Sequence, residues 1–536
     1  MDRIIATNSA IIIENYEWNE CEQLEKYFRI YEPVTHSYYY LGIFYDSENK
    51  RLYLPRGIDI WFVEKITNMN VDVLVNSYTK YQTFDDISIR YLPRDDAQKE
   101  TLRFMLGKQE YRETATKSQL SVNLSTGKGK TYVTIATLAY LGIRGIVIAD
   151  SVSWLKQWRD RTVEYTDISE KEICMMSGSG NAFKLLNLSD EYLKKYKLFL
   201  VTHDTIQSFG TNYGWDKVTE LFEHLKIGVK IFDEAHLNFK NLCMIDFYTN
   251  VYKTYYLTAT PAKSSDDENR VYQMYFKNIP AIELFDENED PHTSYVAIQY
   301  NSRPSPVDIS TCRNKYGLDR NKYTEYVVRQ DNFYKLLVII MDIALKYTST
   351  PGSKFLMYIG TNNAILKVYQ WIIENYPELR GDVGIYTSIV SLEEKQEACS
   401  KRLILSTTKS AGAAVDIPGL KLTVVLAEPF KSEVIAKQTL GRTRDANTMY
   451  IEIVDKGFNQ CSRYYYSKLS IFEKYATDCS VIRLSDNELD ARSANIIQNR
   501  MAAIAMMQYT RAFSHTTGPQ RAFKFTQEPI KAFSFH

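Results

Sequence analysis

The sequence predicts an α/β protein in which two tandem parallel-sheet domains follow a small α+β module. Between about residues 91 and 480, short and almost continuously apolar runs alternate with amphipathic segments of helical length. This alternation is typical of parallel strands whose sheet is covered by helices on both faces. The length of 536 residues also favours two or three domains, because one hydrophobic core rarely extends over so long a chain.

The apolar runs divide the chain into four expected parts. Residues 1–90 hold short β-type runs but no phosphate-binding motif, so we expect an accessory module there, whose role in substrate recognition is a hypothesis from position alone. Residues 91–285 and 286–485 are expected to form the two α/β domains. The runs expected to be strands are SYYYLGIFYD and KRLYLPRG in the module, LSVNLS, GIVIAD, KLFLVT, GVKIFDEA and KTYYLTAT in the first domain, and SYVAIQYN, KFLMYIG, GDVGIYT, KRLILST, LTVVLAE and MYIEIVD in the second.

Residues 486–536 differ in character and are expected to form a flexible C-terminal tail. RAFSH, RAFKF and KAFSF begin at Arg511, Arg521 and Lys531, with glycine and proline residues between them. This spacing suggests a docking segment for a protein partner in residues 510–536. The alternative is low-complexity sequence that packs nowhere.

The composition argues against several classes of protein. Lys+Arg and Asp+Glu each number 65, whereas a protein that binds duplex DNA only through its phosphates is more often basic. A histone-like binder is therefore not expected, although a motor that holds a strand in a local cleft is compatible with neutrality. The seven cysteines include no C-x-x-C pair, which argues against a standard zinc module and fits a reducing compartment.

No segment of the sequence is expected to enter a membrane. The most apolar stretch, Leu336 to Leu345, contains Asp342 and is too short to span a bilayer, so we expect a buried helix. The first residues also lack the pattern of a secretory signal. We therefore expect a cytoplasmic protein, in the host-cell cytoplasm if the chain is viral.

The segment from Leu124 to Thr131, LSTGKGKT, has the context of a phosphate-binding loop, because it follows an apolar strand and precedes a helical stretch. Glycines allow backbone N–H groups to converge on phosphates at a helix N-terminus. Lys130 would bridge the β- and γ-phosphates of ATP, and Thr131 would bind Mg²⁺. Leu124 replaces the usual first glycine, and a simple Gly/Lys turn is the alternative. The residues expected to contact the nucleotide are Ser125, Thr126, Gly127, Lys128, Gly129, Lys130 and Thr131.

Two adjacent carboxylates, Asp233 and Glu234, end the apolar run GVKIF and are followed by Ala-His. They are expected at the carboxyl edge of the parallel sheet, where ligands bind in such folds. Asp233 would hold Mg²⁺ together with Thr131, and Glu234 would orient and deprotonate the attacking water. The alternative is a surface helix that merely begins with Asp-Glu-Ala-His.

Leu257-Thr-Ala-Thr-Pro261 ends the next strand and would place two hydroxyls beside these carboxylates; an unremarkable Thr-rich strand end is the alternative. The loop, DEAH and TATP in this order resemble the first motor domain of superfamily 2 helicases of the DEAH-box type. The resemblance covers about residues 91–480 and implies two RecA-like domains with ATP and Mg²⁺ bound between them.

The second domain supplies further matches to this family. The segment at residues 406–418, STTKSAGAAVDIP, resembles motif V, with Gly412 and Asp416 as its typical members. The resemblance implies that Asp416 belongs to the nucleotide-binding residues.

Residues 438–444, QTLGRTR, resemble motif VI. A guanidinium from the second domain can neutralise transition-state charge only when the interdomain cleft closes. Arg442 matches the family pattern Gln-x-x-Gly-Arg-x-x-Arg, but its last position is occupied here by Asp445, and Arg444 stands one residue early. Which arginine acts as the finger stays open, and a basic helix surface is the alternative for both.

Weaker matches complete the resemblance. Gln98 precedes Lys130 at the distance where the family has an adenine-reading glutamine, although a solvated helix glutamine is an equal alternative. Three other segments correspond to motifs Ia, Ib and IV, and the tryptophans of the first could equally belong to the core. These segments are Trp154 to Trp158, Val201 to His203, and Thr361 with Asn362.

The resemblance implies an ATP-dependent DNA helicase or translocase that remodels forks, junctions or R-loops. The segment AGAAVDIPGL followed by QTLGR is most similar to phage and large-DNA-virus helicases of the branch-migration type. DNA is favoured over RNA as the partner; an RNA helicase, or a double-strand translocase that separates no strands, is the alternative. A non-enzymatic clamp is disfavoured by the intact Lys130, Asp233 and Glu234.

Overall fold

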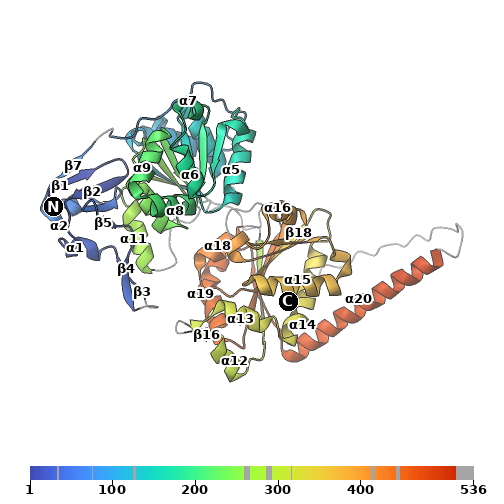
Figure 1. Cartoon of the computed structure of the whole chain (residues 1–536). Coiled ribbons are helices and arrows are strands. Elements are labelled where there is room, and N and C mark those ends of the chain that lie inside the picture. The colour runs from blue at the N-terminus through green and yellow to red at the C-terminus, as the bar shows by residue number, and fades with distance from the viewer. Residues whose placement is uncertain are drawn as a thin grey trace.

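The computed structural model of the chain confirms the α/β architecture (Figure 1). Its description covers residues 1–32, 36–74, 77–124, 128–258, 266–284, 293–314, 317–411, 417–441 and 447–514. Within these residues, two seven-stranded parallel sheets follow one another along the chain, each with flanking helices. They are two tandem RecA-like domains, and a smaller mixed sheet precedes them.

The N-terminal module is built on a five-stranded sheet in the order β5-β6-β2-β1-β7, beside a hairpin of β3 and β4. Its elements are β1 (Arg3–Ala6), β2 (Ala10–Glu14), α1 (Glu22–Lys26), β3 (Arg29–Glu32), β4 (Ser37–Tyr40), β5 (Phe44–Asp46), β6 (Arg51–Pro55), α2 (Ile60–Thr67) and β7 (Val71–Val73).

This module shares one hydrophobic cluster with the first RecA-like domain. Phe28 and Leu54 of the module belong to the same buried cluster as Leu242 and Val271 of the domain. Gly57, in the turn after β6, has no room for a side chain. A Cβ atom there would lie 2.1 Å from a backbone oxygen in helix α11 of the first domain. The module and the first domain therefore pack as one unit.

The first domain has the strand order β10-β11-β9-β12-β13-β8-β14. Its strands are β8 (Gln119–Leu124), β9 (Gly145–Ala149), β10 (Ile173–Met176), β11 (Leu198–Thr202), β12 (Val229–Phe232), β13 (Lys253–Thr258) and β14 (Ala281–Leu284). Its helices are α3 (Asp96–Leu106), η1 (Gln109–Thr116), α4 (Lys130–Leu141), α5 (Val152–Tyr165), η2 (Glu170–Glu172), α6 (Ser179–Leu185), α7 (Asp190–Leu193), α8 (His203–Tyr213), α9 (Trp215–His224), α10 (Phe239–Tyr248) and α11 (Asp266–Phe276). Because β8, β13 and β12 are parallel neighbours, their carboxyl ends meet at one edge.

The second domain repeats the pattern in the order β19-β20-β18-β21-β22-β15-β23. Its strands are β15 (Thr293–Tyr300), β18 (Lys354–Ile359), β19 (Val383–Tyr386), β20 (Leu403–Ser406), β21 (Leu420–Ala427), β22 (Thr448–Asp455) and β23 (Cys479–Arg483), with a small pair of β16 (Arg313–Asn314) and β17 (Gly317–Leu318). Its helices are α12 (Pro306–Thr311), α13 (Arg320–Val327), α14 (Asp331–Tyr347), α15 (Asn362–Asn375), η3 (Pro377–Leu379), α16 (Leu392–Ser400), α17 (Thr408–Ala411), α18 (Glu433–Leu440) and α19 (Asn459–Tyr475).

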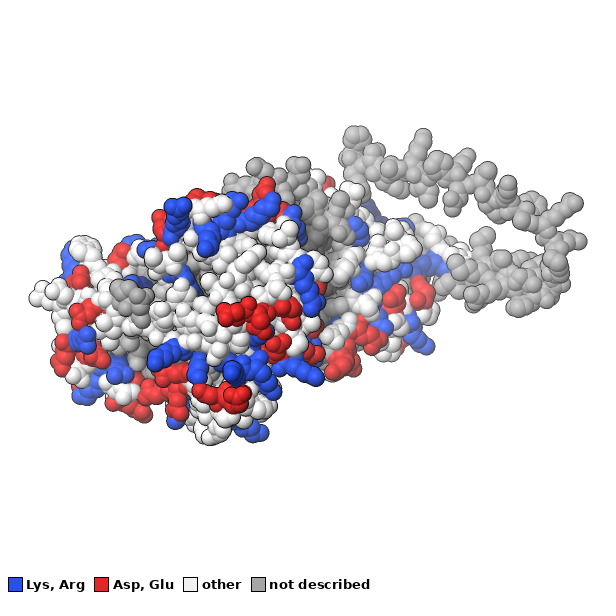
Figure 2. All heavy atoms as spheres, turned by 90° about the horizontal axis from the view of Figure 1, so that it is seen from above, with Lys and Arg blue, Asp and Glu red and all other residues white. Residues whose placement is uncertain are grey.

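The most apolar stretch of the chain forms α14, as predicted, and Leu336, Leu337 and Ile340 on it are fully buried. Among the described helices, none combines the length and apolar character needed to cross a membrane. On the face shown in Figure 2, basic and acidic side chains are interspersed in small groups, in keeping with the zero net charge.

Within residues 486–536, which are expected to form a flexible tail, the described residues from Asp486 to Ser514 form one long helix, α20, which projects from the second domain (Figure 1). The helix begins at this point because Ser485 and Glu488 cap each other's backbone N–H groups. This reciprocal arrangement is a capping box. Leu489 is buried against the domain, and Asp490 forms a 2.6 Å ion pair with Lys335 of α14. Most of the basic-Ala-Phe repeat lies outside the described residues.

Candidate nucleotide-binding and catalytic site

The acidic pair lies at the carboxyl edge of the first sheet. Strand β12 ends at Phe232, and the backbone N–H of Asp233 still donates to Ile148 of β9 at 2.9 Å. Glu234 then takes a left-handed backbone conformation, with φ of 49°, which turns the chain sharply out of the sheet. The following N–H, of Ala235, donates to Leu257 of β13 at 2.9 Å. Two neighbouring strands therefore fix the turn that carries both carboxylates.

Lys130 reaches this turn from the neighbouring loop. It is the first residue of α4, and its Nζ donates to the backbone oxygen of Leu124 at 3.1 Å. The same Nζ lies 3.7 Å from Oε1 of Glu234. Both side chains are nearly buried, at 11% and 12% exposure, so their opposite charges offset part of the cost of burial. The structure thus brings together the predicted lysine and the predicted catalytic carboxylate.

Asp233 is held by a residue whose role was not predicted. The indole Nε1 of Trp158, on α5, donates to Oδ2 of Asp233 at 2.8 Å. Burial and the adjacent Glu234 raise the pKa of Asp233 to about 6, while the bond from Trp158 and the charge of Lys130 act in the opposite direction. Trp154 and Trp158 are both buried in the domain core. No sequence pattern signals the Trp158 contact, because it arises only when α5 packs on β9 and β11, next to the end of β12.

His236 links the acidic pair to the end of β13. Its Nδ1 lies 2.8 Å from the hydroxyl of Thr258 and 3.4 Å from Oε2 of Glu234. Thr258 is the first threonine of TATP, so the hydroxyl expected beside the carboxylates is present there. The remaining residues of that motif, 259–261, lie outside the described residues.

Gln98 packs against the phosphate-binding loop and is not solvated, since it is only 3% exposed. Its Oε1 accepts from the N–H of Arg94 at 3.0 Å, and its Nε2 donates to the backbone oxygen of Lys128 at 3.4 Å. Asp95 fixes this start of α3 by accepting from the backbone of Gln98. The glutamine therefore ties the beginning of α3 to the loop.

The described end of the loop turns sharply into α4 at Gly129. Gly129 has φ of +85°, a conformation that glycine adopts without steric cost. A Cβ atom there would lie 2.2 Å from Nε2 of Gln98, so any larger residue would fill the space between the loop and Gln98. The lysine at a helix N-terminus suits phosphate groups. The hydroxyl of Thr131 and the carboxylate of Asp233 are the hard oxygen donors that Mg²⁺ prefers. The residues present therefore fit ATP and Mg²⁺.

Several predicted site residues cannot be placed. They lie outside the described residues and are Ser125, Thr126, Gly127, Gly412, Asp416, Arg442 and Arg444. In the second domain, the described Thr361 caps α15 and donates to Glu325 of α13 at 2.5 Å. Thr361 therefore has a structural role within the second domain.

An acidic contact between the two domains was also not predicted. Asp150 follows β9, accepts a hydrogen bond from Asn238, and has a pKa that burial and then Asp204 raise. The positive charge of Lys409, on α17 of the second domain, lowers the pKa of Asp150. The carboxyl edge of the first sheet thus faces a basic group of the second domain.

Comparisons with known proteins agree with this core. Residues 92–263 match the family model described as "Type III restriction enzyme, res subunit". A "Putative DNA 3'-5' helicase Rad25" from Haloarcula marismortui is 26% identical over 324 residues, which are 59% of this chain and 46% of that protein. "Transcript termination protein A18" of Yaba monkey tumor virus is 22% identical over 343 residues, 60% of this chain and 64% of that protein. The chain thus spans about half to two thirds of these relatives' lengths.

Among solved structures, S. cerevisiae Dbp5 bound to RNA and ADP BeF3 is similar with a TM-score of 0.49 and 14% identity, over 75% of this chain and 93% of that one. The family match covers residues 92–263, the part of the first RecA-like domain in which Lys130 and the acidic pair lie together at one sheet edge.

Proposed function

We propose that the protein is an ATP-dependent DNA helicase or translocase, which couples ATP hydrolysis to the unwinding or remodelling of forks, junctions or R-loops. The observation that carries this proposal is the approach of Lys130 to Glu234, 3.7 Å apart at the carboxyl edge of the first sheet. These residues come from separate motifs, and ligands bind at this edge in parallel α/β sheets.

Lys130 binds the β- and γ-phosphates in the proposed mechanism, exchanging its contacts with Leu124 and Glu234 for phosphate oxygens. Thr131 and Asp233 would hold Mg²⁺, which would neutralise phosphate charge when bound. Trp158 keeps the carboxylate of Asp233 oriented. Glu234, released from the lysine, orients the attacking water and accepts its proton.

The second domain completes the site when the cleft closes. Arg442 or Arg444 neutralises charge on the γ-phosphate, and Asp416 joins the nucleotide-binding residues, while Gln98 of the first domain reads the adenine. A ligand drives a conformational cycle only if it binds one state more tightly. Contact between the γ-phosphate and the second domain supplies that preference, so that hydrolysis reopens the cleft and advances the strand.

DNA is the favoured substrate because the archaeal relative is named as a DNA helicase and because the motif set resembles viral and phage DNA helicases of the DEAH type. The relative named as a transcript termination protein keeps an RNA substrate as the second candidate. The cysteines are all free, which accords with a cytoplasmic protein. Residues 510–536 are proposed to bind a protein partner, so that their deletion leaves ATP hydrolysis intact.

The nucleotide site is tested by Lys130→Ala and Glu234→Gln. Each is expected to abolish nucleic-acid-stimulated ATP hydrolysis while the far-ultraviolet circular dichroism spectrum stays unchanged. Lys99→Ala is the matched control, because Lys99 is exposed on α3 and pairs only locally with Asp96. Near-normal turnover by either site variant would show that the site is assigned wrongly.

The substrate is tested by measuring ATP hydrolysis with single-stranded DNA, duplex DNA, branched DNA and RNA, followed by strand displacement on the best activator. DNA is expected to stimulate most, and branched DNA to be unwound. Stimulation by RNA alone would establish the RNA alternative. Stimulation by duplex without strand displacement would identify a translocase.

A further inference from the structure

The hairpin β3–β4 has one packed face and one outward face. Arg29 pairs with Tyr40 and Tyr31 with Tyr38 across the strands, and side chains of opposite and alternate residues share a face. On the other face, Tyr39 donates to Glu268 of α11 at 2.9 Å. The outward face therefore carries three tyrosines and an arginine. Tyr31 and Tyr38 on it are 41% and 57% exposed.

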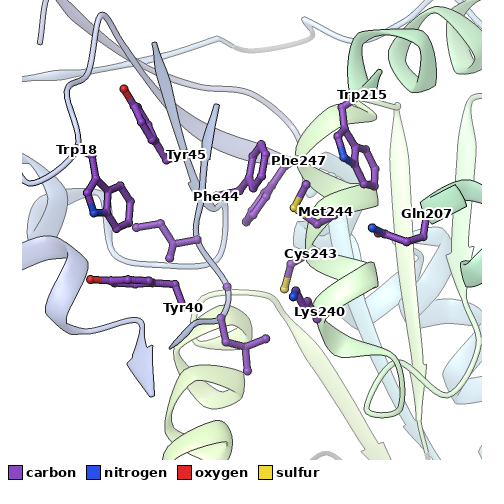
Figure 3. A pocket seen from close by; sticks show the side chains of 13 residues that line it. Trp18, Tyr40, Phe44, Tyr45, Gln207, Trp215, Lys240, Cys243, Met244 and Phe247 are labelled. Carbon is purple, nitrogen blue, oxygen red and sulfur yellow. The ribbon is translucent and has the colours of Figure 1, made fainter. Parts of the chain in front are cut away.

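The outward face of the hairpin leads into a cavity between the N-terminal module and the first domain (Figure 3). Its volume is about 750 Å³, within the range of sites that hold small organic groups. Six of its 13 lining residues are aromatic, and they come from both sides. They are Trp18, Tyr40, Phe44 and Tyr45 of the module, and Trp215 and Phe247 of the domain. The ring of Trp18 stands at 87° to that of Tyr40, with centroids 4.8 Å apart.

Two polar side chains line the same cavity. Oε1 of Gln207, on α8, is buried and has no hydrogen-bond partner among the described residues. Figure 3 shows the amide nitrogen of Gln207 directed toward the cavity, so this side chain can offer a donor to a group that enters. Lys240, in the first turn of α10, is exposed, and the described part of the chain provides no carboxylate partner for it. The cavity thus combines flat aromatic faces, a polar amide and a positive charge.

These three features match the three parts of a nucleotide. Aromatic side chains stack on bases of any sequence, an amide can pair with a base edge, and an ammonium can pair with a phosphate. A base inside a duplex is covered on both faces by its neighbours, so only an unpaired nucleotide can offer its face to a ring. A peptide would use the aromatic wall but would need no cation at the rim.

We propose that this cavity and the outward face of β3–β4 bind unpaired nucleotides of the strand, as a second nucleic-acid site apart from the RecA-like cleft. The proposal rests on the proposed function in that nucleic acid is the substrate. It gives the N-terminal module a defined role: to capture single-stranded segments next to a junction.

The experiment measures binding of the full-length protein, without ATP, to a fluorescein-labelled oligothymidylate of about 20 nucleotides by fluorescence anisotropy. A second probe has the same length and phosphates but abasic sites in place of the bases. Tyr38→Ala and Tyr40→Leu are expected to weaken binding of the intact probe by about 5- to 100-fold each, and to leave binding of the abasic probe unchanged. Lys240→Ala should weaken binding of both probes alike.

Trp61→Ala is the matched control, because Trp61 is 67% exposed on α2 of the same module and is not part of the cavity. It should bind both probes as the wild type does, and thermal melting should show that every variant folds. Tyrosine variants that bind the intact probe normally would overturn the proposal, and so would equal weakening of both probes.

Failure of this proposal is distinguishable from failure of the proposed function. If the wild type hydrolyses ATP without any stimulation by nucleic acid, the proposed function fails, whereas the two probes still decide whether the cavity binds bases. If stimulation is present but the tyrosine variants need no more oligothymidylate for half-maximal stimulation than the wild type, the cavity proposal fails alone.

Discussion

At the scale of single residues, Trp158 combines packing with support of the catalytic pair. Its indole Nε1 fixes the carboxylate of Asp233 from inside the domain core. Partners that orient a metal-binding side chain commonly contribute a factor of about 10 to 100 to metal affinity or activity. Trp158→Phe keeps the ring in the core but removes the donor, so we expect the Mg²⁺ concentration for half-maximal ATP hydrolysis to rise at least about tenfold.

A Mg²⁺ titration of the steady-state ATPase rate checks this expectation. Trp154→Phe is the control, because Trp154 is also buried on α5 and stands one turn earlier. Its Mg²⁺ dependence should equal that of the wild type. An equal shift for both variants would mean that core packing, and not the hydrogen bond, determines the effect.

His203 makes stability depend on pH. It begins α8 with its ring stacked on Phe232, at a centroid distance of 5.8 Å, and burial lowers its pKa to about 4. In the unfolded chain the pKa is about 6.5. As the pH falls from about 6.5 to about 4, the unfolded state takes up a proton that the folded state does not, so stability is lost in this window. The full loss is about 3 kcal/mol.

Urea unfolding at pH 7 and at pH 5 measures this effect. His203→Phe retains a flat ring beside Phe232 but cannot titrate. The variant should therefore lose less unfolding free energy than the wild type between the two pH values. Identical pH dependence of the two proteins would show that His203 does not contribute.

At the scale of elements, the junction of loop and helix α4 depends on Gly129. A methyl group there meets the amide of Gln98 at 2.2 Å and also strains a backbone with φ of +85°. Gly178 has a similar φ of +79° but nothing within 4 Å of an added Cβ. Alanine strains the backbone at both positions, and at Gly178, whose ψ is 154°, the cost is about 1–3 kcal/mol. Only Gly129→Ala, however, should weaken nucleotide binding.

Titration with a fluorescent ATP analogue tests this difference. Equal nucleotide binding by Gly129→Ala and the wild type would contradict the assigned role of this turn.

The sequence could predict those elements whose signal is local. Buried parallel strands are apolar runs, and Lys130 and Glu234 stand directly at the ends of such runs. The edge strands β10, β14 and β23 were not predicted, because β10 and β14 are short and β23 is largely exposed along its length. The capping pair Ser485 and Glu488 was a readable signal for α20 that the repeat beyond it obscured.

Contacts made only by tertiary packing could not be predicted. Trp158 and Asp233 are joined because α5 packs on β9 and β11, next to the end of β12, and no spacing in the sequence encodes that contact. The aromatic cavity is of the same kind, since its walls come from the N-terminal module and from α8, α9 and α10. Sequence patterns thus indicated the reacting groups but not the groups that support them.

At the scale of the whole molecule, the packed unit of N-terminal module and first domain faces a separate second domain (Figure 1). The proposed cycle requires the two to approach when ATP and nucleic acid bind. We expect a non-hydrolysable ATP analogue together with single-stranded DNA to reduce the radius of gyration measured by small-angle X-ray scattering. Lys130→Ala should show no such change, and an unchanged radius for the wild type would argue against closure.

Helix α20 would act as a lever in such a movement. It has 29 residues and is therefore about 43 Å long, and its first turns are anchored to α14 by Leu489 and Asp490. A rigid rod fixed at one end converts a small rotation of its base into a large sweep of its tip. Whatever binds near the end of α20 would therefore travel farther in each cycle than any part of the nucleotide cleft.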